Sequence, residues 1–419
     1  MKKKLLTTLI ASLIVFSGFA QQFNLSAELR PRYENRHGFG TLLNTNEDGS
    51  NFVSQRTRLN FDFKNEKLKL KIVMQNVRVW GDVSTLASDD TATALHEAWA
   101  AYIPNSNVSF KFGRQEIVYD DHRIFGNVGW AQQARSHDAF LFKYTPNANT
   151  KLDIGFALNA DSQSNSDNLY SNAAGYKSFQ YAWYHGDFNS IGLSFLLLNT
   201  GIEYLEGGDS QAINYMQTMG PRLTYKSGKF NANAAAYFQT GKSLNADVSA
   251  SYFSGNLGYK INDDFSIGVG AEYLSGKDSN ATSTEIKSFA PLFGTNHKFN
   301  GFMDYFYVGN HANSVGLTDI NMTLGYSKNK FSAKLTPHLF SAAADVFDGA
   351  TKMDASLGTE IDFTIGYKIA KDINLNAGFS KLFATDTMEI LKGGDKDENN
   401  SWAWVMMTFK PTLFSHKTK

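Results

Sequence analysis

The stretch that decides the fold is Phe23-Asn24-Leu25-Ser26-Ala27-Glu28-Leu29-Arg30-Pro31-Arg32-Tyr33-Glu34-Asn35-Arg36, near the start of the chain. Apolar and aromatic side chains occupy its odd-numbered positions as far as Tyr33, and polar or charged side chains occupy its even-numbered positions. Because successive side chains of a β-strand point to opposite faces, this alternation predicts a strand with one apolar and one charged face.

The same alternation recurs along the chain, for example over residues 265–273 and 357–368. Strands of soluble β-sandwiches usually have about five or six residues. Many segments here run to about ten residues or more, which is the length of a tilted strand that crosses a bilayer. Tyr, Trp and Phe gather near the segment ends, where an aromatic girdle meets the lipid–water interface. The pattern favours a membrane β-barrel.

Polar, turn-forming sequences separate these segments. Short connections are predicted at 64–67, 104–107, 145–150, 186–189, 226–229, 260–264, 327–330 and 368–372, and longer ones at 37–51, 81–93, 118–134, 160–175, 200–213, 241–246, 276–315, 342–355 and 384–400. Short and long connections alternate strictly. This asymmetry predicts an all-β fold, a closed antiparallel transmembrane β-barrel of about 18 strands with short periplasmic turns and long extracellular loops. Residues 21–419 form one domain in this interpretation.

The connection at 276–315 is the longest, and we expect no membrane-spanning strand in it. Its aromatic residues are numerous enough for the loop to fold into the barrel as a plug. The sequence leaves open whether it does.

The first twenty residues predict a signal peptide, not a part of the fold. Lys2, Lys3 and Lys4 precede an apolar run that ends at Gly18-Phe19-Ala20. A basic start, a short apolar run and small residues at the cleavage point are typical of secretion. We therefore expect residues 1–20 to be removed on export to the outer membrane of a Gram-negative cell.

Composition excludes several other classes of protein. The 40 basic and 40 acidic residues cancel, which argues against nonspecific binding of nucleic acid. The absence of Cys excludes disulfides, thiolate metal sites and a lipidated Cys. A hydrophobic content of 42% is too high for a disordered chain.

Arginine is concentrated in one part of the chain, since all arginines but one precede residue 136. Several lie on the polar phase of their strands and are expected to point into the lumen. The candidate pore-lining or anion-binding residues are Arg30, Arg32, Arg56, Arg58, Arg114, Arg123 and Arg135, with Glu28, Asp62 and Glu116 as acidic partners. They form either salt bridges that stiffen the barrel or a row of guanidinium groups that passes anions, as charged rings do in selective pores.

Several motifs around these arginines resemble one known family. Gln55-Arg56-Thr57-Arg58-Leu59, Gly113-Arg114-Gln115-Glu116-Ile117, Arg123-Ile124-Phe125-Gly126 and Arg135-Ser136-His137-Asp138 follow one another in an order that resembles the alginate export porins. The segment 291–301 resembles the long outer-loop motif of the same family. The resemblance implies an outer-membrane barrel of eighteen strands and an anion-selective conduit for an acidic polysaccharide. Such exporters are associated with a long periplasmic turn that gates the pore, and the short connections predicted here also fit a simpler anion porin.

Sequence motifs for catalysis or cofactor binding are missing. The histidines lack the spacing of a zinc site, and Ser136, His137 and Asp138 cannot form a triad because neighbours in a strand face opposite sides. We therefore expect no enzyme, no metal and no cofactor.

Two functions fit these features. The first is an outer-membrane channel for anionic solutes such as alginate, with export or uptake left open. The alternative is a surface binding or structural barrel, an adhesin or receptor, with a plugged lumen. The expected partners are outer-membrane lipid, lipopolysaccharide and an anionic oligo- or polysaccharide, without nucleic acid, and we expect a monomer.

Overall fold

The computed structural model describes residues 21–90, 92–165, 169–170, 175–207, 210–307 and 309–418. The predicted signal peptide lies outside the described residues. The strands of the large sheet are β1 (Gln22–His37), β2 (Ser50–Lys64), β3 (Leu68–Val79), β4 (Thr93–Asn105), β5 (Val108–Gln115), β6 (His137–Asn147), β7 (Thr150–Leu158), β8 (Ser178–Phe188), β9 (Ile191–Glu206), β10 (Ser210–Ser227), β11 (Phe230–Ser243), β12 (Ala246–Lys260), β13 (Phe265–Leu274), β14 (Leu317–Lys328), β15 (Phe331–Ser341), β18 (Ser356–Ala370), β19 (Ile373–Ala384), β20 (Ser401–Phe409) and β21 (Thr412–Lys417).

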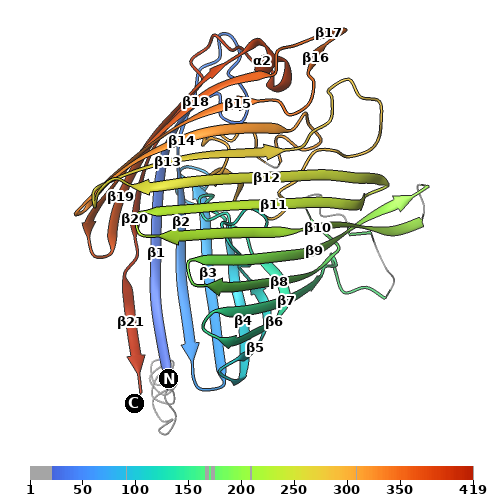
Figure 1. The fold of residues 1–419 in the computed structure, drawn as a ribbon. Helices are drawn as coiled ribbons and strands as arrows, with labels where there is room; N and C mark the ends of the chain where they lie inside the picture. The colour runs from blue at the N-terminus through green and yellow to red at the C-terminus, as the bar shows by residue number, and fades with distance from the viewer. Residues whose placement is uncertain are drawn as a thin grey trace.

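The sheet closes on itself (Figure 1). Consecutive strands pair antiparallel, and β1 pairs with β2 on one side and with β20 and β21 on the other. The sheet has 19 strand segments, but β20 and β21 are two halves of one strand, so the barrel has 18 strands as predicted. The break falls at Pro411, which has no backbone N–H to donate to the sheet. Closure leaves no unpaired edge in lipid.

The connections differ at the two ends of the barrel. At one end the turns are short, and the first and last described residues meet there, since the Gln21 amide donates to the Thr418 hydroxyl at 2.7 Å. The opposite end carries the long loops, which include the hairpin β16 (Phe347–Asp348) and β17 (Thr351–Lys352), the 3-10 helix η1 (Asn296–Lys298) and helix α2 (Asp386–Lys392). None of the described helices is long and apolar enough to cross a membrane.

Two of the predicted long loops are wrong. Residues 200–213 belong mostly to the hairpin of β9 and β10, which pair from Ile191–Tyr225 out to Glu206–Ser210. Residues 241–246 form the tight end of the hairpin of β11 and β12. Strands that continue beyond the bilayer carry polar residues on both faces, so their alternation disappears while the backbone pairing persists.

The outer face of the barrel is apolar. Leu29 and Leu59 are each 38% exposed on it, whereas Arg30 and Arg56 of the same two strands point inward and are 7% and 4% exposed. At the short-turn end the outer face carries aromatic pairs such as Phe230 and Tyr259, whose ring centroids lie 4.7 Å apart. The alternation and the girdle therefore follow the sequence prediction.

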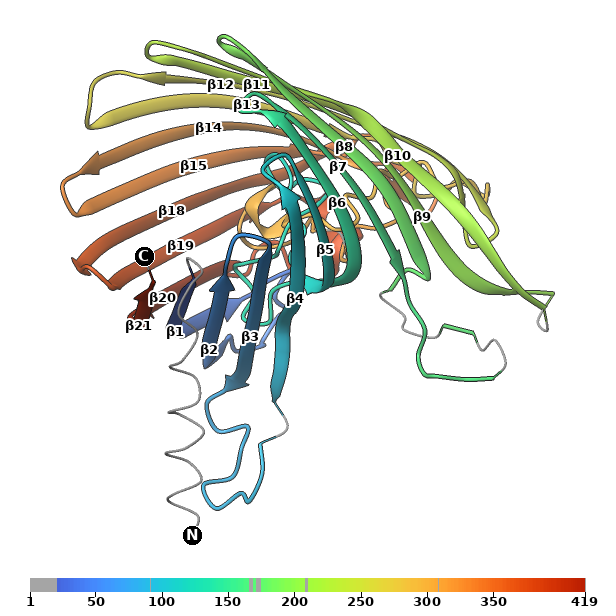
Figure 2. The same cartoon turned by 90° about the horizontal axis from the view of Figure 1, so that it is seen from below.

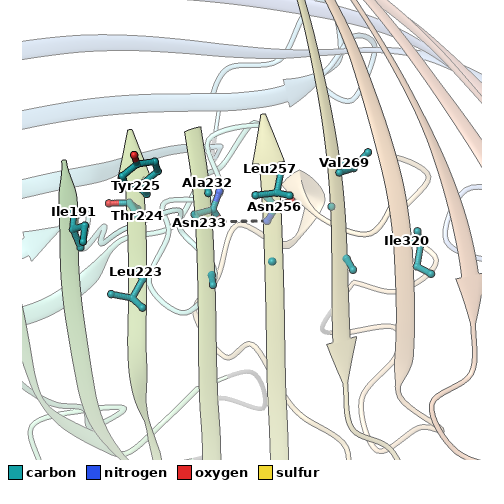
Figure 3. Close-up of a pocket in the computed structure, with 14 residues that line it drawn as sticks. Ile191, Leu223, Thr224, Tyr225, Ala232, Asn233, Asn256, Leu257, Val269 and Ile320 are labelled. Carbon is teal, nitrogen blue, oxygen red and sulfur yellow. Dashed lines mark hydrogen bonds between the residues drawn. The ribbon is translucent and has the colours of Figure 1, made fainter. Parts of the chain in front are cut away.

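A shallow apolar hollow of about 680 Å³ lies on the wall formed by β9 to β14 (Figure 3). Leu257, Val269 and Ile320 border it and are 63%, 53% and 53% exposed. A Cβ atom added at Gly255 would meet no other atom within 4 Å, so the middle of the hollow is open. Because these side chains have the outward phase, the hollow belongs to the lipid-facing surface and not to the lumen.

The lumen itself is filled by two loops from the long-loop end, loop A (116–136) and loop B (275–316). Rings and aliphatic side chains of both loops are buried inside the ring of strands, including Phe125, Phe289, Met303 and Tyr305. Part of loop B is visible in yellow and orange within the barrel (Figure 2). The described residues of loop B contain no membrane-spanning strand, as predicted, and they fold inward.

Candidate functional site in the barrel lumen

Loops A and B pack directly against each other across the lumen. The Gly126 amide donates to the Phe293 carbonyl at 2.8 Å, and the Thr295 amide donates to the His122 carbonyl at 2.9 Å. A Cβ atom at Gly294 would lie 2.2 Å from the Arg123 carbonyl oxygen. Only glycine permits this close approach of the two backbones.

Three arginines of the N-terminal strands hold loop A. Arg30 donates to the carbonyls of Gly129, Trp130 and Ala131 at 2.8, 2.9 and 3.2 Å, and Arg32 donates to the Trp130 carbonyl at 2.8 Å. Arg56 reaches the same segment at 3.4 to 3.5 Å. We call Arg30, Arg32 and Arg56 the arginine clamp. All three side chains point inward but are buried against backbone carbonyls, so in this structure they do not face an open passage.

Buried carboxylates support the clamp from behind. Glu28 Oε1 lies 2.6 Å from Arg56, and its other oxygen lies 2.9 Å from Lys410. Glu34 accepts from Arg32 at 2.8 Å and from Arg36 at 2.7 Å. The sequence places both Glu28 and Glu34 on the same polar phase as these arginines, and the structure pairs both with them.

Arg58 and Glu116 lie beside the clamp. Arg58 donates to Gln75 at 2.7 Å and is 3.9 Å from Glu116, which also contacts His96 and Asn127 at 2.8 Å. Arg58 Nη2 is buried without a hydrogen-bond partner among the described residues.

Asp62 lies elsewhere. It borders a small hollow with Lys69 and Trp99, on strand segments next to the short turns. The structure does not bring Asp62 to the clamp.

Arg114 does not share the inward phase of the other strand arginines. It alternates in step with Phe112, which is 55% exposed on the outer face, and it pairs with Asp138 at 2.7 Å. The arginine and aspartate side chains are 43% and 61% exposed. The strand phase of Arg114 is outward, since its neighbour Gln115 is fully buried on the inward phase, but the Arg114 side chain also borders the outer of the two lumenal chambers described below.

Arg123 is a structural centre of loop A. It is 2% exposed, donates to Glu272 and Asn300 at 2.9 Å each, and lies 4.5 Å from the ring centre of Phe299. Burial acts to lower the pKa of Arg123, but the Glu272 carboxylate, Tyr252 and Asp121 together outweigh it and raise the pKa above its ordinary value. Arg123 therefore joins loop A, loop B and the wall.

Arg135, at the end of loop A, has a different environment. It donates to the Gly294 carbonyl at 3.1 Å, and no carboxylate among the described residues lies within ion-pair distance. Burial lowers its pKa. An arginine that lacks an acidic partner is available to an anionic ligand.

The segment 294–304 of loop B, which we call the septum, divides the lumen into two chambers. The outer chamber has a volume of about 680 Å³ and is bordered by His96, Trp130, Arg135 and His297. The inner chamber has a volume of about 350 Å³. Its border includes several amides, the cations Arg222, Lys298 and Lys334, and the acids Asp121, Glu272 and Asp319, of which Asp121 pairs with Arg222 and Glu272 with Arg123. Successive septum residues, His297 and Lys298, thus face different chambers. Lys334 and Asn233 lie near the starts of β15 and β11, so the inner chamber is toward the short-turn end.

The septum rests on acidic side chains of the wall. The Met303 amide donates to Glu360 at 2.9 Å and the Phe302 amide donates to Asp362 at 3.1 Å. Glu360 and Asp362 are 0% and 1% exposed. Lys298 and Lys334 are by contrast exposed in the inner chamber. The two acids beneath the septum, Glu360 and Asp362, are covered, whereas the two lysines are accessible, which the balanced composition does not reveal.

A closed 18-stranded antiparallel barrel with loops folded into its lumen is the fold of outer-membrane porins. Residues 21–403 match the family described as alginate export, and the chain belongs to that family.

Solved porins share the fold. OccK11 (OpdR) of Pseudomonas aeruginosa has a TM-score of 0.61 at 13% identity, covering 94% of this chain and 96% of that one. A BenF-like porin from Pseudomonas fluorescens Pf-5 has a TM-score of 0.60 at 14% identity, covering 93% and 99%. OccK2 (OpdF) of Pseudomonas aeruginosa, solved in complex with glucuronate, has a TM-score of 0.59 at 13% identity, covering 94% and 98%. No curated protein matches the chain.

Proposed function

We propose that this porin passes anionic solutes, and that its substrates are acidic sugars or oligosaccharides such as uronates. The observation that carries the proposal is the unequal exposure of charge in the two chambers. Glu360 and Asp362 are covered by the septum, whereas Arg135 faces the outer chamber and Lys298 and Lys334 face the inner one. Accessible cations between low-dielectric walls raise the local concentration of anions and oppose cations.

Two comparisons support the substrate class. The chain belongs to the alginate export family, and alginate is a polyuronate. OccK2, which has the same fold, was solved with glucuronate. The proposal includes cleavage of residues 1–20, contact of the outer loops with lipopolysaccharide, and a monomeric barrel.

The filled lumen favours a second candidate, a receptor or adhesin that binds its partner without conducting. Loops A and B meet across the lumen, and the septum separates the chambers. In this alternative the same cations bind an anionic surface partner and no solute crosses.

Planar-bilayer recordings separate the two functions. Under a salt gradient, a channel gives a current whose reversal potential shows anion preference, and added polyuronate blocks it while a neutral glucan does not. Replacing Arg58 and Arg135 together by Gln should weaken the preference, and the lipid-facing change Ile267→Val should leave it unchanged. A wild-type protein that prefers cations contradicts the proposal, and one that is correctly folded but carries no current supports the receptor.

A further inference from the structure

The wall of the inner chamber opposite the arginine clamp carries a row of amides at one level of the barrel. Asn233 on β11 pairs in register with Asn256 on β12, Asn256 with Gly270 on β13, and Gly270 with Asn321 on β14. All three asparagines border the inner chamber. Figure 3 shows Asn233 and Asn256 side by side, and the Asn256 amide donates to Asn233 Oδ1 at 3.2 Å.

Gly270 allows two of these amides to converge. A Cβ atom at Gly270 would lie 2.3 Å from Asn256 Oδ1 and 2.8 Å from Asn321 Oδ1. The oxygens of both side chains therefore occupy the space above a residue without a side chain. Gly258 and Gly268 pair one level nearer the short turns, where the amide of Asn231 lies over Gly258, 2.7 Å from the position of an added Cβ atom.

Most of the hydrogen-bonding capacity of this row is unused within the protein. Among the described residues, Asn321 has no side-chain hydrogen bond, and Thr336 Oγ1 is buried without a partner on the same chamber wall. Each amide offers two donors and an acceptor, and a threonine hydroxyl offers both. Buried polar groups without partners are costly unless water or a ligand satisfies them.

Two lysines border the same chamber. Within the described part of the chain, neither Lys298 nor Lys334 has a carboxylate within 4.0 Å. Lys298 Nζ donates to the Asp121 carbonyl at 2.9 Å, and Lys334 Nζ lies 5.2 Å from the centre of the Phe302 ring. The chamber volume of about 350 Å³ lies within the range of small-molecule sites.

We infer that the row Asn233, Asn256 and Asn321 selects polyhydroxylated acids, that is sugar acids, over acids of similar size and charge that lack hydroxyl groups. The lysines attract the carboxylate, and the amides exchange hydrogen bonds with the hydroxyls. The inference rests on the proposed anion channel and assigns its specificity to the wall that contains almost no arginine. A site built to bind hydroxyl groups rejects an analogue without them, because its own polar groups are then left unpaired.

Current block in planar bilayers tests the inference. Glucuronate and cyclohexanecarboxylate, each added on the short-turn side, have the same charge and a similar ring. We expect glucuronate to block the wild-type current at lower concentration. The double variant Asn256→Leu, Asn321→Leu should raise the half-blocking concentration of glucuronate roughly tenfold, as the loss of about two hydrogen bonds predicts, and leave that of cyclohexanecarboxylate unchanged.

Matched variants separate hydroxyl recognition from charge and folding. Asn376→Leu changes an asparagine on β19 with the inward phase, outside the chamber, and should have no effect. Lys334→Gln should weaken block by both acids equally. The inference is overturned if wild type is blocked equally by both acids, or if the double variant affects both equally while the barrel keeps its heat-modifiable gel mobility. A wild type without anion preference would instead contradict the proposed function.

Discussion

Replacing Arg30 by Gln should loosen loop A and make the pore fluctuate. Arg30 makes five hydrogen bonds, two to the Gln132 side chain and three to the carbonyls of Gly129, Trp130 and Ala131. Hydrogen bonds to a charged group contribute about 1.5–3 kcal/mol each, and they are not additive. A shorter neutral amide can retain one or two of them, so the docking of loop A should weaken by about 3 kcal/mol. That change raises the open population of the loop roughly 150-fold.

Single-channel recording measures this opening directly. The wild type should show a steady current, and Arg30→Gln should add brief openings of larger conductance. Arg114→Gln is the matched control, because its ion pair with Asp138 is exposed to solvent and exposed pairs contribute about 0–1 kcal/mol. Identical conductance and noise in wild type and Arg30→Gln, with the variant folded, would refute the assignment of a clamp.

Three further results are expected. Burial lowers the pKa of His311 in loop B to about 4 from 6.5, so its neutral form stabilises the fold; that stability is full above pH 6.5 and is lost as the pH falls through about 4. The current noise of the wild type should therefore rise as the pH falls from 6.5 to 4, and that of His311→Gln should rise less. Equal pH dependence in the two proteins would contradict the assignment of this stability to His311. Gly294→Ala places a Cβ atom 2.2 Å from the Arg123 carbonyl oxygen, so hydrogen exchange in loops A and B should accelerate while the strands stay protected. Antibody should reach an epitope inserted at 46–49 on intact cells but not one at 228–229, and the reverse would show that the short turns face outward.

The arginines show how far the sequence predicts the site. Alternation places Arg30, Arg32 and Arg56 on the inward phase, and the structure agrees. Alternation does not predict what fills the lumen. The carbonyls that these arginines bind lie 73 to 101 residues away in the chain. Arg114 shows the limit of a motif, because its strand phase is outward although its side chain still borders the outer chamber.

The inner chamber could in part have been found from the sequence. Asn233, Asn256, Asn321 and Lys334 all lie on the polar phase of their strands. Their signal was weaker than that of the arginines because a neutral amide in a strand is equally compatible with a wet wall. Recognition of a chamber requires the register that puts the amides on one level, and strand register depends on pairing across the sheet.

The sequence by itself determined the membrane barrel, its number of strands and its family, because these depend on local periodicity, turn composition and short motifs. Only the tertiary structure decided that loop B crosses the lumen, that the arginine clamp binds loop A, and that Glu360 and Asp362 are covered while Lys298 and Lys334 are accessible. These features arise from contacts between residues far apart in the chain. Periodicity reports which face of a strand a side chain occupies, whereas the charge presented to a solute depends on which loop lies over that face.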